Sequence, residues 1–385
     1  MNIVLLTSVD GNGGSPSTAY HTARLLARAG HQATLFAPGN YWKERGAREG
    51  VAVDASLELK RGFHPLSFWR DWRRFRKFMR AQKIDAVLVQ KSPEQWLARF
   101  ALAGFAKKVG FVRLRGVVFA IKPSSFNRWL HHSQQRVACS ASVIAEQYAK
   151  LPGFDRARVR VLLEGVDIER YTPATLQERA EARKTLGLDP EALVLGTAGR
   201  PSSVKGHDLL LRAFAKAGPF ADRPPVKLAI FWDESRRGPG AFTKEQFDAS
   251  ARELGVAERV LVRPGKLDDM RTVYRALDAY ILPSRGSEGS SRAGLEASAS
   301  GLPLIASHVG VLPDLIEDGQ TGRLVPPNDE AALAAALKEL IAHWPAAQSL
   351  GAAARTRMEA KFRDTQYADA LARLIEEAVA EARAK

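Results

Sequence analysis

The chain has 385 residues, of which 45% are hydrophobic and 26% charged, with a formal net charge of +15 and one cysteine, Cys139. This length suits two domains of about 150–200 residues rather than one, and the composition excludes a disordered or fibrous chain. No apolar stretch approaches the roughly 18 residues of a membrane-spanning helix, the N-terminal run is too short for a signal-peptide core, and one cysteine cannot form an internal disulfide. We therefore expect a cytoplasmic protein, attached to the inner face of the cytoplasmic membrane.

The positive charge is confined to the first half of the chain. Residues 1–165 hold 27 Lys and Arg against 11 Asp and Glu, a net charge of +16, whereas residues 166–385 hold 30 against 31, a net charge of −1. Such an excess reports on binding partners rather than on fold. We expect the first half to face an anionic membrane surface or an anionic acceptor. Nucleic acid is not expected, because no aromatic-interleaved strand motif or zinc-ligand spacing accompanies the charge.

Apolar runs alternate with amphipathic segments along both halves, an order typical of parallel strands joined by crossover helices. In the first half the expected strands are residues 2–7, 31–36, 85–89, 109–114, 137–140 and 159–163, and the expected helices include 17–29 and 66–83. The pattern breaks at residues 164–173 and then restarts. The second set of expected strands is 193–197, 226–231, 260–262, 279–282 and 304–306, and the second set of helices is 209–217, 243–254, 267–276 and 292–300, followed by 55 helical residues interrupted at Pro345.

This order predicts an α/β protein with two Rossmann-like, doubly wound domains that face each other across a cleft. The expected domains are residues 1–165 and 166–362, with a C-terminal helix, 363–385, that packs back on the first domain. In such sheets, ligands bind outside the carboxyl ends of the strands. The informative residues should therefore lie in loops that follow strands.

The most informative loop is SRGSEGSSRAGLEASASGLP, residues 284–303. Glu288 falls in the loop, and Glu296 lies about two turns inside a helix that is expected to begin near Ser290. Carboxylates accept hydrogen bonds from paired sugar hydroxyls, and the free N–H groups of Ser290 and Ser291 would favour a diphosphate. On spacing alone, a Gly/Ser loop that caps an ordinary helix also explains the motif.

Two further loops follow expected strands. Arg200 and Lys205 lie in TAGRPSSVKGHDLL, residues 197–210, where two cations suit a pyrophosphate or form a solvated basic loop. Gly13 and Gly14 lie in DGNGGSPS, residues 10–17, where glycines permit close approach of a ligand or form a plain tight turn. Pro16 replaces the last glycine of G-x-G-x-x-G, so the dinucleotide-binding interpretation is weak.

Taken together, these segments resemble glycosyltransferase family 4. The resemblance rests on GRPSSVKG (199–206), GKLDD (265–269), PSRGSEGSSRAGLEASASGLP (283–303) and VGVLPDLIEDGQTGRLVPPND (309–329). It implies the GT-B fold, with the donor nucleotide sugar held mostly by the second domain and the acceptor by the first. It also implies a hexosyl transfer that retains the anomeric configuration and needs neither metal nor other cofactor.

The resemblance also assigns roles to residues. Arg200 and Lys205 match the basic pair on the donor diphosphate, Glu296 the carboxylate on the ribose hydroxyls, and Glu288 the carboxylate beside the donor sugar. We expect Glu288, Arg200 and Lys205 to act in catalysis. The remaining expected donor-site residues, for which a UDP-sugar is favoured over a GDP-sugar, are Gly13, Gly14, Gly265, Lys266, Gly289, Ser290 and Ser291. No D-x-D triple occurs in the chain, so the usual carboxylate pair for a nucleotide-bound metal ion is absent.

The sequence departs from the family at two places. Relatives carry a histidine at the end of the strand expected at 109–114, where this chain has Arg113 and Arg115, which become candidate acceptor residues. His131 and His132 come later and are expected on the surface. Relatives usually have Asn-Gly at the interdomain linker, where this chain has Glu164-Gly165.

The segment LSFWRDWRRFRKFMRAQK, residues 66–83, is basic and aromatic. Its apolar stripe of Phe68, Trp72, Phe75, Phe78 and Met79 should pack on the sheet. Its basic face, with the candidate membrane or acceptor residues Trp69, Arg73 and Arg76, is expected to lie on anionic lipid.

The function predicted from these features is hexosyl transfer to an anionic or lipid-linked acceptor in lipopolysaccharide core or other envelope glycan synthesis. Two alternatives remain. One is a transferase that acts on a soluble acceptor, and the other is a non-catalytic protein that binds nucleotide sugars.

Overall fold

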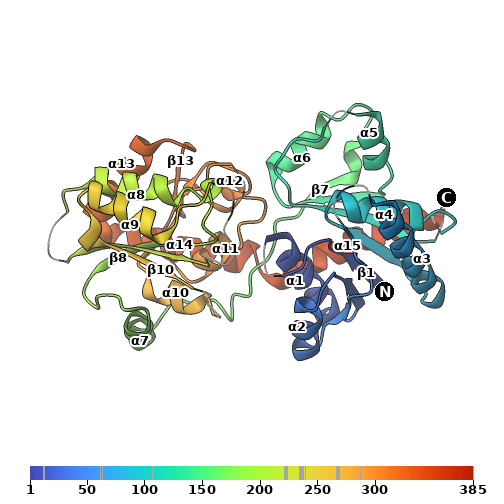
Figure 1. Cartoon of the computed structure of the whole chain (residues 1–385), viewed down its shortest axis with the longest axis horizontal. Coiled ribbons are helices and arrows are strands. Elements are labelled where there is room, and N and C mark those ends of the chain that lie inside the picture. Colours follow the sequence, from blue (N-terminus) through green and yellow to red (C-terminus); the bar gives the residue numbers. More distant parts are fainter. Residues whose placement is uncertain are drawn as a thin grey trace. The chain divides into compact units, whose positions relative to one another are not determined.

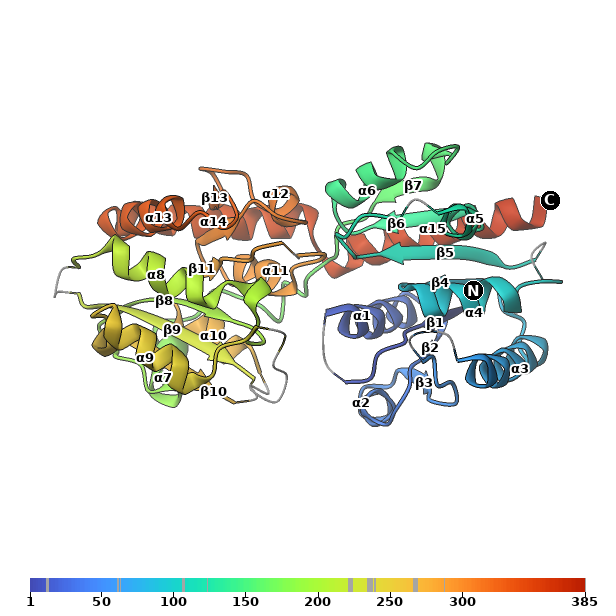
Figure 2. The same cartoon turned by 45° about the horizontal axis from the view of Figure 1, so that its top comes forward.

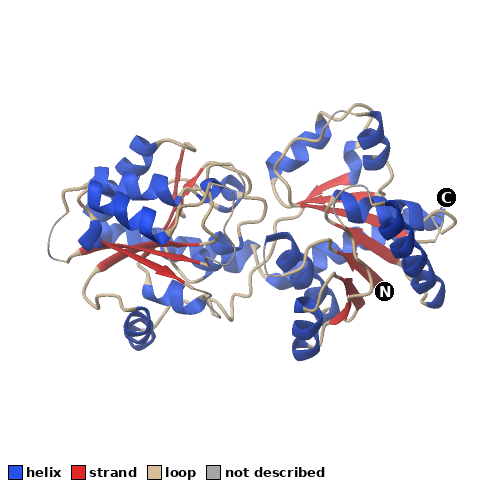
Figure 3. Ribbon diagram, viewed as in Figure 1, coloured by secondary structure: helices blue, strands red, loops and turns tan. Residues whose placement is uncertain are grey.

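The structure is a computed structural model that describes residues 1–384 except positions 12–13, 61, 63, 106–107, 123, 221–223, 234–237, 239, 266–268 and 287. The described chain forms two compact units (Figure 1): unit 1 is residues 1–165 with 364–385, and unit 2 is residues 166–363. Each unit has a parallel sheet with helices on both faces (Figure 3), so the predicted α/β class with two doubly wound domains is confirmed.

Unit 1 has a seven-stranded parallel sheet in the order β3-β2-β1-β4-β5-β6-β7. Its strands are β1 (Asn2–Leu6), β2 (Gln32–Phe36), β3 (Ala52–Asp54), β4 (Ala86–Val89), β5 (Gly110–Arg115), β6 (Arg136–Cys139) and β7 (Val159–Val161). Its helices are α1 (Gly14–Arg28), α2 (Tyr41–Glu49), α3 (Pro65–Ala81), α4 (Ser92–Ala101), α5 (Ser125–His131), α6 (Ser142–Ala149) and α15 (Asp364–Ala384). After β1 the chain adds β2 and β3 on one side of that strand and then returns to place β4 on the other side of β1. This topological switch point is where ligands bind in such sheets.

The two faces of this sheet are covered by different helices. One face packs against α1, α2 and α15 through a core that includes Leu26, Trp42 and Leu371. The other face packs against α3 and α4, where Phe75 and Met79 are buried. The apolar stripe predicted for residues 66–83 therefore lies in the core, because Phe68, Trp72 and Phe78 also pack against this second cluster.

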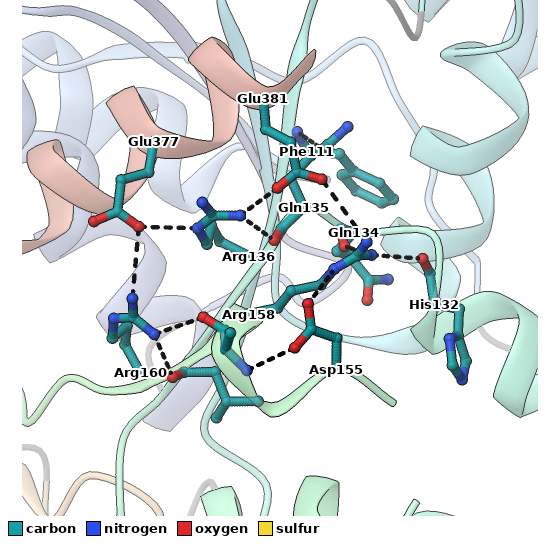
Figure 4. A network of polar contacts seen from close by, with 12 residues as sticks. Phe111, His132, Gln134, Gln135, Arg136, Asp155, Arg158, Arg160, Glu377 and Glu381 are labelled. Atoms are coloured by element: carbon teal, nitrogen blue, oxygen red, sulfur yellow. Dashed lines mark hydrogen bonds and ion pairs between the residues drawn. The ribbon is translucent and has the colours of Figure 1, made fainter. Parts of the chain in front are cut away.

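The C-terminal helix α15 belongs to unit 1 and runs along β5 and β6 (Figure 2). Its acidic outer turns are bound by arginines at the start of β6 and beside β7 (Figure 4). Arg136 Nε lies 2.9 Å from Glu377 Oε2, and Arg158 Nη2 lies 3.8 Å from Glu381 Oε1. These ion pairs and the buried Leu371 and Ile375 fasten the end of the chain to the first sheet.

Unit 2 has a six-stranded parallel sheet in the order β10-β9-β8-β11-β12-β13. Its strands are β8 (Leu193–Ala198), β9 (Val226–Trp232), β10 (Val260–Pro264), β11 (Ala279–Leu282), β12 (Leu304–Ser307) and β13 (Arg323–Val325). Its helices are α7 (Leu176–Leu186), α8 (His207–Ala217), α9 (Lys244–Glu253), α10 (Arg271–Ala276), α11 (Arg292–Ala299), α12 (Leu312–Leu315), α13 (Glu330–Ala342) and α14 (Trp344–Lys361). The strand order runs outward from β8 on one side and from β11 on the other, so the switch point of this sheet lies between these two strands. The loops that follow them meet at one edge.

A buried ion pair joins the amino-terminal ends of β8 and β11, away from the loops that follow the two strands. Asp278 Oδ2, just before β11, accepts hydrogen bonds from Val194 N of β8 at 2.7 Å and from Arg183 Nη2 of α7 at 2.7 Å. Arg183 is 2% exposed and also donates to the carbonyl oxygens of Ala276 (3.0 Å) and Pro190 (2.6 Å). One guanidinium therefore holds α7, α10 and the two central strands in register.

We expect Arg183→Ala to destabilise unit 2 by about 3 kcal/mol, because it leaves the buried Asp278 carboxylate with only Arg179, whose side chain is 36% exposed, as a cationic partner. Urea unfolding followed by tryptophan fluorescence measures the change. Arg252→Ala, which removes an exposed arginine of α9, is the matched control and should change stability by less than about 0.5 kcal/mol. Equal midpoints for the two variants would contradict this role for Arg183.

Candidate functional site

The loops that follow β8 and β11 meet through a direct ion pair. Lys205, at the end of a short 3-10 helix after β8, places Nζ 2.6 Å from Oε1 of Glu288, in the loop after β11. Ser284 Oγ donates to the same oxygen at 2.5 Å. Glu288 is only 4% exposed, while the Lys205 side chain is 30% exposed. The structure thus joins two of the predicted catalytic residues at the switch point, with the ammonium group on the solvent side.

The loop after β8 is held against the end of β11 by a second pair of charges. Arg285 Nη1 and Nη2 bind Asp208 Oδ1 and Oδ2 at 2.8 and 2.6 Å, a two-point contact typical of arginine and carboxylate. Burial alone would raise the pKa of Asp208, but the hydrogen bonds from Arg285 and Arg212 lower it below its ordinary value. Asp208 therefore stays ionised, and the loop that carries Lys205 keeps its position.

Two glycines allow the close approach of these loops. Gly206 has φ +68°, and a Cβ there would lie 2.0 Å from the carbonyl oxygen of Pro283. Gly310 has φ +59°, and a Cβ there would lie 1.9 Å from the carbonyl oxygen of Glu288. The same Glu288 oxygen accepts the N–H of Val311 at 2.8 Å. Only glycine fits at either position, because both the backbone angle and the space exclude a side chain.

The second predicted carboxylate lies on α11. This helix begins at Arg292, after an N-cap residue, Ser291, in the left-handed conformation with φ 45°. The backbone N–H groups of Ser290 and Ser291 form no hydrogen bond with the described part of the chain. The start of α11 therefore offers free N–H donors, as anion-binding helix termini do. Glu296 of this helix accepts a hydrogen bond through Oε2 from Tyr274 Oη at 3.0 Å.

A buried tyrosine links the surroundings of the two carboxylates. Tyr280 of β11 exchanges hydrogen bonds with the backbone of Ala198, at the end of β8, at 2.9 and 3.0 Å. Its pKa is raised by burial first and then by the negative charges of Glu288 and Glu296. Tyr274, which donates to Glu296, packs against the Tyr280 ring with centroids 5.6 Å apart, so Glu296 lies beside the tyrosine whose pKa the charge of Glu288 also raises.

The other expected donor-site residues lie in different surroundings. Arg200 is exposed and binds no other residue among those described, so its guanidinium is available to a ligand. Gly265 follows β10 with φ +135° and open space around its Cα, and Gly289 lies beside Glu288. Gly14 is the first residue of α1 in unit 1. Gly13 and Lys266 lie outside the described residues.

Several residues of this region were missed by sequence reasoning. The partners that orient the predicted residues are Tyr274, Tyr280, Ser284, Arg285 and Gly310. Only Ser284 and Arg285 had a local signal, because both lie in the loop that carries Glu288, four and three residues before it. The tyrosines come from other elements, so nothing in their own segments identifies them.

The carboxyl edge of unit 1 is organised by a buried carboxylate. Glu94, in the first turn of α4, is fully buried and accepts the N–H groups of Ser8 (2.6 Å), Gln90 (2.7 Å) and Lys91 (2.6 Å). It thereby ties the end of β1 to the end of β4. Glu164, at the linker, is also buried and accepts from Thr18 Oγ1 of α1 at 3.1 Å. Its carboxylate therefore packs on the helix that follows the Gly-rich loop.

The two candidate acceptor arginines of β5 are buried, with Arg113 2% and Arg115 6% exposed. The expectation that His131 and His132 lie on the surface is wrong: His131 is 5% exposed and His132 is half-buried. His131 is the last residue of α5 and turns inward, where its Nδ1 lies 3.1 Å from the hydroxyl of Tyr148. Burial, and then Arg113 and Arg115, lowers the pKa of His131 to about 3, which keeps the imidazole neutral.

The candidate membrane residues of α3 differ in their surroundings. Trp69 is 51% exposed, and the Arg73 guanidinium lies 4.6 Å from the centre of its ring. Arg76 instead donates to the carbonyl oxygens of Ala101 (3.3 Å) and Ala103 (2.7 Å). Trp69 and Arg73 thus face solvent, while Arg76 serves mainly to hold the end of α4.

Two family models match consecutive parts of the chain. The model described as Glycosyltransferase Family 4 matches residues 12–170, and the model described as Glycosyl transferases group 1 matches residues 178–357. The chain belongs to glycosyltransferase family 4. The two matches meet near the division between unit 1 and unit 2, so each sheet corresponds to one family model.

Curated relatives of this family 4 chain include D-inositol 3-phosphate glycosyltransferases. The one from Mycobacterium sp. (strain KMS) is 37% identical over 212 residues, which are 55% of this chain and 46% of the relative. The one from Mycolicibacterium smegmatis is 33% identical over 251 residues, 65% of this chain and 54% of the relative. The chain thus spans about half the length of the curated relatives that it matches.

Solved structures match over nearly the whole chain. A glycosyltransferase from Rickettsia africae has a TM-score of 0.85 at 17% identity and covers 98% of each chain. Anabaena HepE in complex with UDP-glucose has a TM-score of 0.79 at 17% identity, covering 98% of this chain and 99% of that one. The lipopolysaccharide outer core galactosyltransferase WaaB has a TM-score of 0.73 at 18% identity, with the same coverage. These likenesses establish the GT-B fold for this family 4 chain.

Proposed function

We propose that this protein transfers a hexose from a nucleotide sugar to an anionic or lipid-linked acceptor with retention of the anomeric configuration. The observation that carries the proposal is the Lys205–Glu288 ion pair beside the open start of α11, at the switch point of unit 2. A cation that can turn to a diphosphate, and carboxylates that can accept sugar and ribose hydroxyls, are the groups that a sugar diphosphate requires.

The proposed roles follow from the contacts. Lys205 and Arg200 bind the diphosphate and neutralise the charge that grows on it as the glycosidic bond breaks, which is electrostatic stabilisation of the transition state. Glu288 lies beside the donor sugar, and Glu296 holds the ribose hydroxyls. A UDP-sugar is the favoured donor, and the solved complexes of the similar HepE contain UDP and UDP-glucose.

The reaction is proposed to need no metal. The described residues contain no group of three or more His, Cys, Asp or Glu side chains placed to hold a metal ion. Lys205 and Arg200 would supply the positive charge that a metal supplies in other transferases. Activity that is unchanged by EDTA is the expected result.

Two acceptor classes fit the proposal. A glycan of lipopolysaccharide core or another envelope polymer suits the basic first half, and the similar WaaB is named a lipopolysaccharide outer core galactosyltransferase. A phosphorylated soluble acceptor is the second candidate, because the curated relatives are named for D-inositol 3-phosphate and because unit 1 buries two arginines.

The test is turnover of a panel of UDP-, GDP- and ADP-sugars by the purified protein, with the products identified by mass spectrometry and the anomeric configuration by NMR. We expect one nucleotide sugar to be hydrolysed or transferred with retention. Binding without turnover would support the non-catalytic alternative, and neither binding nor turnover with any donor would overturn the proposal.

A peripheral attachment to membranes is proposed for unit 1. Besides Trp69 and Arg73, exposed aromatic side chains continue from α3 onto α4 and α5, where Phe100 is 44%, Phe126 44% and Trp129 41% exposed. The rings of Phe100, Trp129 and Phe126 form a chain of contacts, with Phe100 and Trp129 centred 6.0 Å apart and Trp129 and Phe126 5.6 Å apart. Exposed aromatic rings among arginines suit the interface of an anionic bilayer. None of the helices in the described ranges has the length and apolarity needed to cross a membrane.

We expect the protein to pellet with anionic vesicles but not with neutral ones, and less at high salt. Each arginine near an anionic leaflet contributes about 1 kcal/mol, a factor of about five in affinity. The double variant Trp69→Ala/Arg73→Ala should therefore lose at least this factor. The matched control is Arg28→Ala/Arg48→Ala, which removes two exposed charges from α1 and α2 on the other sheet face. Equal losses in both variants would exclude α3 as the docking surface.

A further inference from the structure

Two arginines of unit 1 are buried without an acidic partner. Arg113 and Arg115 point to the sheet face opposite α15, because the alternating residues Val112 and Leu114 belong to the core that α15 covers. Arg115 Nη2 donates only to neutral groups, the carbonyl oxygen of Phe119 at 2.7 Å and Gln147 Oε1 at 2.9 Å. The side chain of Arg113 forms no hydrogen bond or ion pair with any residue that the structure describes, and its Nε and Nη1 are fully buried.

The undescribed positions of unit 1 do not supply the missing counter-charge. The residues of unit 1 outside the described ranges include no aspartate or glutamate: they are Asn12, Gly13, Arg61, Phe63, Ala106, Lys107, Pro123 and Lys385. His131, Tyr148 and Cys139 lie within electrostatic reach of both arginines, and none of the three carries a negative charge at neutral pH. We call Arg113, Arg115, His131 and Tyr148 the β5 cationic cluster.

A buried guanidinium without a counter-charge destabilises the folded state, and arginine cannot escape by losing its proton. Such a feature is expected where a ligand supplies the opposite charge. The planar guanidinium matches a phosphate oxygen pair better than any other cationic side chain does. Arg115 adds a second positive charge, and its guanidinium is held in place by Phe119 and Gln147.

The position of the cluster is also that of a ligand site. Arg115 is the last residue of β5, and Arg113 pairs with Val89, the last residue of β4. Both arginines therefore lie at the carboxyl edge of the sheet, one strand from the switch point between β1 and β4, where open α/β sheets bind ligands.

We propose that Arg113, with Arg115 beside it, binds a phosphate group of the acceptor. This proposal rests on the proposed function, since it gives unit 1 the acceptor, and it names phosphate as the chemistry that the acceptor must carry. The neutral His131, hydrogen-bonded to Tyr148, lines the same cluster without adding a third charge. Acceptors that differ only by this phosphate would be distinguished at Arg113.

Inorganic phosphate is the probe, and the full chain is used throughout. Because phosphate can also enter the donor site of unit 2, the comparison is made in the Lys205→Ala background, with and without Arg113→Gln. Thermal unfolding in phosphate is compared with unfolding in chloride at equal ionic strength, and calorimetric titration gives the affinity. With Arg113 present we expect a rise in Tm of about 2 °C or more at saturating phosphate. Arg113→Gln should lower phosphate affinity by about tenfold or more.

The baseline stability distinguishes a binding residue from a structural one. In chloride, Arg113→Gln should unfold at the same Tm as its parent or a higher one, because it removes a buried unpaired charge. A lower Tm in chloride, or phosphate binding that is unchanged by Arg113→Gln, would overturn the proposal. Turnover of nucleotide sugars is measured separately, on wild type and on the single variant Arg113→Gln, because Lys205→Ala is itself expected to lose turnover. Turnover without Arg113-dependent phosphate binding defeats this inference alone, whereas Arg113-dependent binding without turnover supports the anion site and defeats the proposed function.

Discussion

Replacing Lys205 by alanine should lower kcat by about 10²–10³-fold with the nucleotide sugar that the protein uses, because it removes a preorganised cation from the leaving diphosphate. In the structure the ammonium group lies 2.6 Å from Glu288 Oε1. In the proposed reaction the donor diphosphate competes with this carboxylate for the same ammonium group. Lys205 would then exchange one anionic partner for another during binding, and its charge would be available when the bond to the sugar breaks.

The measurement is a steady-state comparison of wild type, Lys205→Ala and Lys205→Arg. The arginine variant keeps the charge and should retain more activity than the alanine variant. Lys216→Ala is the matched control, since Lys216 lies on the adjacent α8 with a side chain that is 56% exposed. A kcat for Lys205→Ala within about threefold of wild type would refute a catalytic role for this lysine, because that loss is far below the effect of removing a transition-state donor.

Replacing Glu296 by alanine should weaken donor binding by about 10²-fold, because hydrogen bonds to a charged group contribute about 1.5–3 kcal/mol each and a ribose diol makes two. In the structure Glu296 accepts from Tyr274 Oη at 3.0 Å and lies 3.3 Å from Arg292 Nη2. These contacts hold the carboxylate at the start of α11. The effect should appear in the donor Kd or KM more than in kcat, since the ribose does not change during the reaction.

Calorimetric titration with the nucleoside diphosphate of the donor measures this effect without turnover. Tyr274→Phe is the control, because it removes one hydroxyl partner of Glu296 and keeps the ring that packs against Tyr280 with centroids 5.6 Å apart. Its loss should be smaller than that of Glu296→Ala. If Glu296→Ala binds the nucleotide as tightly as wild type, the ribose lies elsewhere.

The strands that carry the site could be predicted from sequence because their composition leaves little choice. The runs at 193–197 and 279–282 became β8 and β11 to within one residue, since four or more consecutive apolar residues between turn signals favour a buried parallel strand. The spacing of Glu288 and Glu296 likewise placed one carboxylate in a loop and one on a helix.

Several short or polar elements could not be predicted, although the short edge strand β7 (Val159–Val161) was expected at 159–163. Ala52–Asp54 and Arg323–Val325 are three-residue edge strands, too short to show a period of two. Residues 41–49 form α2 although most of them are polar, because one residue, Trp42, supplies the buried contact with α1. Tertiary packing decides such elements, and the local sequence does not report it.

The pairing of side chains was equally hidden. Lys205 and Glu288 are separated by 83 residues, and their contact depends on β8 lying next to β11. The burial of His131 depends on Tyr148, which comes from another helix. The absence of a carboxylate beside Arg113 is also a tertiary fact, because the sequence gives the number of acidic residues but not their neighbours.

The proposed function depends most on one location for the donor, the edge of unit 2 where Lys205, Glu288 and Glu296 lie around the start of α11. A crystal structure with the nucleoside diphosphate of the preferred donor tests this directly. We predict diphosphate oxygens within hydrogen-bond distance of Lys205 Nζ and of the N–H groups of Ser290 and Ser291, with the ribose hydroxyls on Glu296. A diphosphate bound away from α11, with Lys205 still paired to Glu288, would contradict it.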